Sequence, residues 1–164
     1  MEARLTTTEL LDRIQTARAD WDSVLAMIAE ECMTQPGVVG DWSVKDMIAH
    51  ITWFERELVG VLQARALVSC DLWNMSQAER NAAVYEANRH RSLSDVRAEA
   101  QQVYQQLLAA IQTLTDDDLH DPRHCANMPT EWLPWQLLAD NSYNHYADHS
   151  AKLLAWHDQA CMAF

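Results

Sequence analysis

The sequence predicts an all-α protein, a four-helix bundle with an additional short helix in its middle connection. Only three glycines and four prolines occur in 164 residues, so long stretches lack the residues that most often interrupt helices. Hydrophobic residues make up 49% of the chain and recur at the three- and four-residue spacing of amphipathic helices. This length fits one domain with one core, expected over residues 1–164.

The first two long helices are each predicted from a capping box followed by an apolar stripe. Thr6-Thr-Thr-Glu9 and Ser43-Val-Lys-Asp46 both place a hydroxyl at the helix start and a carboxylate three residues later. The helices are expected over about residues 7–30 and 43–67, with a segment containing Pro and Gly between them. The stripes are Leu10, Ile14, Ala17, Trp21, Val24, Leu25 and Ile28 in the first helix, and Val44, Met47, Ile48, Ile51, Phe54, Leu58 and Leu62 in the second.

The middle of the chain predicts a short helix and a third long one. Ser76-Gln-Ala-Glu79 is another capping box and begins a short helix that ends near His90. Ser92-Leu-Ser-Asp95 begins the next helix, whose stripe runs to Leu114. Thr115-Asp-Asp-Asp118 is interpreted as a capped turn rather than a metal site, because the helix dipole alone favours carboxylates at a helix N-terminus.

The last helix is expected to begin at Pro134 and to run to about Cys161. Residues 120–134 contain three prolines and are expected to be irregular, and proline suits the first turn of a helix. One stripe of this helix is apolar except where a serine and two histidines occur. It consists of Leu138, Ser142, His145, His149, Leu153 and Trp156.

Charge and hydropathy restrict the partners that are expected. The net charge is −12 and the sequence pI is about 4.8, which disfavours nucleic acid and anionic membrane surfaces as partners. No apolar run reaches the roughly 18 residues of a membrane span. The first residues lack the basic and apolar regions of a signal peptide, so a cytoplasmic location is expected.

The cysteines are expected to be reduced thiols. They are widely spread and form no C-x-x-C pair, which makes a structural disulfide the lesser alternative in a cytosolic chain. Cys125 follows His124 and has the chemistry of a ligand or nucleophile, but it lies in a loop-like stretch. The four are Cys32, Cys70, Cys125 and Cys161.

Two histidines of the last helix are candidates for metal ligands. His145 and His149 are four residues apart, so that on a helix their imidazoles lie on one face. A catalytic zinc ion usually has three protein ligands, and His50 near the start of the second helix is the best third candidate. Pairs at this spacing are common in helices, and the alternative is that each histidine is partly exposed or hydrogen-bonded at a polar end of the bundle. The remaining histidines, His90, His120, His124 and His157, match no ligand position.

Two segments resemble motifs of the DinB-like superfamily, which includes YfiT-type metal-dependent hydrolases. Residues 40–50, Gly-Asp-Trp-Ser-Val-Lys-Asp-Met-Ile-Ala-His, resemble the motif G-x-W-[ST]-v-x-D-x-x-x-H, and residues 145–149 resemble the H-x-x-x-H motif of its last helix. The resemblance covers roughly residues 7–157. Trp73-Asn74 to Tyr85, followed by Ser94-Asp95-Val96, resembles the ClbS/DfsB branch, whose best-known activity is self-resistance to a reactive cyclopropane-bearing toxin.

The superfamily resemblance implies an up-down-down-up bundle that is often dimeric. It also implies a nickel or zinc ion held by one histidine of the second helix and two of the last helix, positions that correspond to His50, His145 and His149. Several members use low-molecular-weight thiols such as bacillithiol or mycothiol in transferase or isomerase reactions. A divalent metal ion, a small thiol and a homodimer are therefore expected.

Polar residues one turn before two of these histidines have two possible roles. Asp46 precedes His50 and Asn141 precedes His145 by four residues, so either side chain can orient a ligand imidazole. Helix capping is the alternative for Asp46, and an ordinary polar contact is the alternative for Asn141.

Aromatic residues near the candidate site also have two possible roles. Trp53 and Phe54 can form the wall of an apolar substrate pocket or can pack in the core, and core packing is the more common role. Trp132 and Trp135 can edge the mouth of the same pocket, with core packing again the alternative.

Three functional hypotheses follow. The favoured one is an enzyme in which the metal ion activates water or a thiol for hydrolysis or thiol transfer on a small electrophilic molecule. The second is a protective protein, like the ClbS/DfsB branch, that binds or inactivates a reactive metabolite or toxin. The third is a structural bundle whose histidines only hold the helices together.

Overall fold

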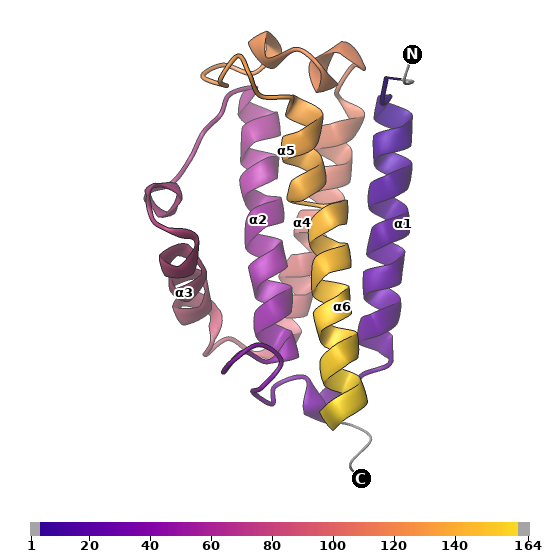
Figure 1. The fold of residues 1–164 in the computed structure, drawn as a ribbon, viewed down its shortest axis with the longest axis vertical. Helices are drawn as coiled ribbons and strands as arrows, with labels where there is room; N and C mark the ends of the chain where they lie inside the picture. The colour runs from indigo at the N-terminus through magenta and orange to yellow at the C-terminus, as the bar shows by residue number, and fades with distance from the viewer. Residues whose placement is uncertain (1–3, 161–164) are drawn as a thin grey trace.

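The computed structural model describes residues 4–160 and arranges them as a helical bundle (Figure 1). Its four long helices are α1 (Thr7–Ala26), α2 (Val44–Ala64), α4 (Leu93–Gln112) and α6 (Tyr143–Ala160). Two shorter helices are α3 (Gln77–Asn88), in the middle connection, and α5 (Pro134–Asp140), which precedes α6. Figure 1 shows α1 and α6 running in one direction and α2 and α4 in the other. The predicted up-down-down-up bundle with an extra short helix is thus confirmed.

The helix starts agree with the capping patterns of the sequence. The Thr6 hydroxyl accepts a hydrogen bond from the Glu9 backbone N–H, and the Glu9 carboxylate accepts one from the Thr6 N–H, so that both halves of the box form. Complete boxes also begin α2 and α3, while the hydroxyl of Ser92 caps α4. Each box satisfies backbone donors that a helix N-terminus otherwise leaves unpaired.

The first two helices end earlier than predicted. α1 ends at Ala26, and the chain continues into a short 3-10 helix that keeps Ile28 and Met33 buried. α2 ends at Ala64 because Arg65 adopts the left-handed conformation, with φ 51°, which terminates a helix. The Arg65 guanidinium donates to the Thr113 carbonyl at 3.0 Å, and this contact with the end of α4 holds the turn.

The single last helix that the sequence predicts is divided into α5 and α6. The break lies at Asn141 and Ser142, whose side chains donate hydrogen bonds to the carbonyls of Leu137 and Leu138, four residues earlier. Such side-chain bonds compete with the backbone ladder and bend or interrupt helices. As a result, α6 begins at Tyr143, two residues before the candidate ligand His145.

α2 contributes many of the buried residues of the core and also carries His50. It packs against α4 and α3, while α1 packs against α6. The core includes fully buried Trp21, Met47, Leu107, Ile111 and Leu153. Within residues 4–160, no helix combines the length and hydropathy needed to cross a membrane.

Candidate metal centre

Three histidines from two helices meet at one point of the bundle. His50 comes from α2, and His145 and His149 come from α6. One ring nitrogen from each lies within 4.8 Å of the other two, and the Nε2 atoms of His50 and His145 are 3.1 Å apart. Two nitrogens on one tetrahedral zinc ion lie about 3.3 Å apart, since Zn–N bonds are about 2.0–2.1 Å long. The separation is therefore of the size that a shared ion requires.

Burial keeps all three imidazoles neutral. His50 and His149 are 4% and 7% exposed, and His145 is partly buried. Loss of hydration lowers the pKa of His50 to about 2, that of His145 to about 3 and that of His149 to about 4. Repulsion from the ammonium group of Lys152 lowers all three pKa values further. Neutral imidazole is the form that binds metals, so the donor set fits a divalent ion such as zinc or nickel.

The depressed pKa values predict acid sensitivity of the metal-depleted protein. Each of these histidines is neutral when folded but becomes charged in the unfolded chain below pH about 6.5, so stability falls as the pH drops from that value toward 4. Each contributes a slope of about 1.4 kcal/mol per pH unit. Urea unfolding at pH 7.5, 6.0 and 5.0 should give a shallower pH dependence for His50→Gln than for the wild type. The exposed control His90→Gln should keep the wild-type slope, and equal slopes in all three proteins would contradict the assignment.

The Nδ1 atoms of the three histidines are buried and have no hydrogen-bond partner among the described residues. Metal-binding histidines usually donate this second N–H to a carboxylate or carbonyl. Asp46 lies one turn before His50; one of its oxygens, Oδ2, caps α2. The other, Oδ1, is also buried and has no hydrogen-bond partner, although Lys45 Nζ lies 3.9 Å from it. No hydrogen bond joins Asp46 to His50 among the described contacts, so its orienting role stays a prediction.

Aromatic rings surround the cluster and hold its geometry. The Trp42 ring centroid lies 5.2 Å from that of His50, and Phe54 lies edge-on to His50 at 4.9 Å and to His145 at 5.0 Å. Trp42 is in turn stacked on Tyr85 of α3, with 5.8 Å between centroids and 5° between planes. The short helix α3 therefore supports the site through Trp42.

Phe54 also lines a groove, and only some of the aromatic residues predicted to form a pocket belong to its lining. Phe54 and Trp132 line the groove, whereas Trp53 is not among its lining residues, and a substrate role for the groove stays a prediction. Trp53 contacts Trp73, another lining residue, at 5.4 Å between centroids. Trp135 packs against the core. The remaining lining residues come mainly from the end of α2, the segment after it and α5.

Asn141 also lines this groove. Its amide donates to the Leu137 carbonyl at 2.9 Å, and no described hydrogen bond joins it to His145. The structure therefore places Asn141 at the helix break, where the alternative of an ordinary polar contact is seen.

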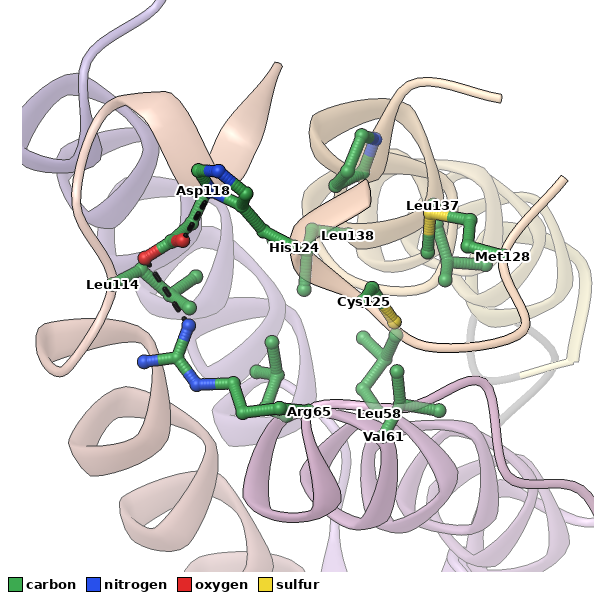
Figure 2. Close-up of a pocket in the computed structure, with 12 residues that line it drawn as sticks. Leu58, Val61, Arg65, Leu114, Asp118, His124, Cys125, Met128, Leu137 and Leu138 are labelled. Atoms are coloured by element: carbon green, nitrogen blue, oxygen red, sulfur yellow. Dashed lines mark hydrogen bonds and ion pairs between the residues drawn. The ribbon is translucent and has the colours of Figure 1, made fainter. Parts of the chain in front are cut away.

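Cys125 lies in a different pocket, at the end of the bundle where α2 meets the connection after α4 (Figure 2). Its side chain lies against the apolar residues Leu58 and Val61, and burial raises the pKa of its thiol. It is not part of the histidine cluster. Cys70 is also a free thiol, and Cys161 lies outside the described residues.

The nearby acidic turn is a capped turn, as predicted. The Asp118 carboxylate accepts a hydrogen bond from the Thr115 N–H at 2.8 Å and from Arg65 at 3.1 Å, and it lies 2.8 Å from His124 Nδ1 (Figure 2). Although its partial burial opposes ionisation, these hydrogen bonds lower the pKa of Asp118 to about 2. His124 and Arg65 thus belong to this turn.

A buried polar network that was not predicted from the sequence lies beside the site. Glu55 is fully buried, and its Oε1 accepts hydrogen bonds from the Arg18 guanidinium at 2.9 Å and from the Tyr146 hydroxyl. Arg18 is 5% exposed and lies over the Tyr104 ring at 4.3 Å. The available signal was a charged residue on each of two apolar stripes, Arg18 between Ile14 and Trp21 and Glu55 between Ile51 and Leu58.

Comparisons with known proteins agree with this architecture. A family model described as the DinB superfamily matches residues 2–159. An uncharacterised protein from Escherichia coli UTI89 shares the fold, with a TM-score of 0.78, 22% identity and 94% of each chain covered. No curated protein sequence matches the chain.

Two further solved structures have the same fold. The colibactin self-resistance protein ClbS, solved in complex with double-stranded DNA, gives a TM-score of 0.79 at 16% identity, covering 99% of this chain and all of that one (100%). DfsB, described as a sibling lethal factor precursor, gives 0.76 at 18% identity, covering 96% of this chain and 98% of its own. At these identities the likeness establishes the fold.

The ClbS complex overturns the exclusion of nucleic acid from the partners. That exclusion was inferred from the net charge of −12, but a protein of the same fold has been crystallised with a DNA duplex. The physical reason is that net charge sums the whole surface, whereas binding depends on the groups that face the ligand. Net charge alone therefore does not decide this class of partner.

Proposed function

Because the chain belongs to the DinB superfamily, we propose that it is a metal-dependent enzyme whose ion is held by His50, His145 and His149. The observation that carries this proposal is the meeting of three neutral imidazoles, two of them buried and one partly buried, with ring nitrogens within 4.8 Å of one another. The ion is nickel or zinc, and the chain acts as one DinB-like domain, paired as a homodimer.

Three protein ligands leave at least one coordination position for water or substrate, the arrangement of a catalytic rather than a structural site. When bound, the ion supplies a Lewis acid that lowers the pKa of water or of a low-molecular-weight thiol and so provides a nucleophile near neutral pH. The reaction is hydrolysis or thiol transfer on a small electrophile.

The chain's own residues orient the ligands and limit access. Phe54 of α2 contacts both His50 and His145, and so packs between the ligands of the two helices. Trp42 packs against His50 and is itself stacked on Tyr85. Phe54 also lines a groove, and we propose that a substrate binds there, next to the cluster.

An open coordination position is testable with cobalt. Tag-free protein is stripped of metal, loaded with Co²⁺ and titrated with azide, and its visible absorption should shift in a saturable way. His149→Ala should show no such spectrum. A cobalt spectrum that azide leaves unchanged would indicate a closed, structural site and would contradict the enzymatic proposal.

A second candidate function is protection by capture or inactivation of a reactive metabolite. The fold likeness to ClbS, a self-resistance protein, and to DfsB favours it. The two functions differ in turnover, since an enzyme releases more product than there is protein, whereas capture stops at one equivalent. Product analysis with an excess of electrophile therefore separates them.

A further inference from the structure

The groove beside the histidine cluster has one charged group in its lining. It has a volume of about 270 Å³ and is walled mainly by apolar and aromatic side chains. Among the described residues that line it, Glu57 is the only charged one, and the other polar ones are Ser69 and Asn141. Such a lining suits a ligand that is largely apolar and carries one positive or hydrogen-donating group.

The carboxylate of Glu57 is held in place at the wall. The Trp73 indole N–H donates to Glu57 Oε2 at 2.7 Å, and Trp73 also contacts Phe54 at 5.7 Å between centroids. A carboxylate can accept about four hydrogen bonds, and the indole uses one of them. Glu57 is therefore a positioned acceptor that can still receive an ammonium group.

The nearby arginines are engaged with other groups. Arg56 pairs with Glu99 on α4. Arg80 lies over the Trp73 ring at 4.4 Å, and its donors are bonded to the carbonyls of Leu72 and Met75. Neither arginine is among the residues that line the groove. An adjoining hollow, which shares Trp132 with the groove, adds the carboxylates of Glu131 and Asp140.

The mouth of the groove exposes apolar surface. Val68 is 45% exposed and Trp132 is 43% exposed, and both line the groove. Contiguous exposed apolar side chains next to a cavity are typical of a ligand site. Phe54, which lines the groove, also contacts His50 and His145 and so links the groove to the cluster.

We propose that this groove binds a small molecule with an apolar or aromatic body and a cationic ammonium group, which pairs with Glu57. This inference rests on the proposed function and deepens it by naming the class of its electrophilic substrate. The same carboxylate disfavours anionic molecules in the groove.

Three probes of one shape test the assignment. 2-Naphthylmethylamine, 2-naphthylmethanol and 2-naphthoate are titrated calorimetrically into metal-depleted, tag-free protein at pH 7. The ammonium probe should bind at least about tenfold more tightly than the alcohol, because a hydrogen bond between two charged groups is stronger than one from a neutral hydroxyl, and the carboxylate should bind most weakly. Equal affinities, tighter binding of naphthoate or no binding of any probe would overturn the proposal.

Three variants test whether Glu57 causes the preference for the ammonium probe. Glu57→Gln should remove the preference for the ammonium probe while leaving the alcohol within about threefold of its wild-type affinity. Glu131→Gln, a neutralised carboxylate in the adjoining hollow, is the matched control and should keep the preference. Trp73→Phe keeps an aromatic wall but frees Glu57, and should reduce the preference partially. A preference that survives Glu57→Gln in a folded protein would overturn the assignment to this residue.

The result of the probe titrations can be distinguished from the result for the proposed metal site. Probe binding is measured without metal, and metal content is measured independently on the same preparation. Protein that takes up metal but shows no ammonium preference refutes the groove assignment alone. Protein that shows the preference but takes up no metal supports the groove and refutes the metal site.

Discussion

Replacement of Arg18 by methionine should destabilise the folded protein by about 3–5 kcal/mol, because it leaves the carboxyl group of Glu55 buried without its cation. Burial already raises the pKa of Glu55, and the opposing attraction of Arg18 is the largest influence that favours its ionised form. Urea unfolding at pH 7 measures the loss. Part of it should disappear at lower pH, where protonation neutralises the unpaired carboxyl group.

Two further variants show whether this cost comes from the unpaired charge. Arg56→Met removes an ion pair with Glu99 at the surface, where the arginine side chain is 44% exposed, and should cost about 1 kcal/mol or less. The double variant Arg18→Met/Glu55→Leu removes both buried charges and should recover most of the lost stability. A loss in Arg18→Met no larger than that in Arg56→Met would contradict the role assigned to this network.

Local patterns explain why the helix starts were predictable. A capping box is completed within four residues, as in Ser43 and Asp46, and depends little on the rest of the fold. The placement of His145 and His149 on one face of a helix is equally local. The meeting of His50 with His145 spans 95 residues of sequence, and it was expected because both motifs resemble those of one superfamily.

Features that depend on tertiary context were less predictable. The break at Asn141 and Ser142 arises because two adjacent side chains bond to backbone carbonyls, whereas such residues often continue a helix. The pairing of Arg18 with Glu55 and the placement of Glu57 beside Trp73 require knowledge of which helices are neighbours. Single charged residues on an apolar stripe indicate that a partner exists but do not identify it.

Loss of one ligand should have the largest effect on metal binding. His149→Ala should lower the affinity for Zn²⁺ or Ni²⁺ by more than about 100-fold, since loss of an outer hydrogen-bond partner already costs about 10–100-fold. His157→Ala removes a histidine from the same helix two turns further on, outside the cluster, and should change the affinity by less than about threefold. Competition with a chromophoric chelator measures both variants.

The most direct test is the metal content of tag-free protein that has been stripped and reloaded with zinc or nickel, measured by elemental analysis beside His149→Ala. A site formed by His50, His145 and His149 should take up about one ion per chain in the wild type, and the variant should lose it. A wild-type protein that takes up neither metal, or a variant that retains one ion per chain, would contradict the three-histidine site.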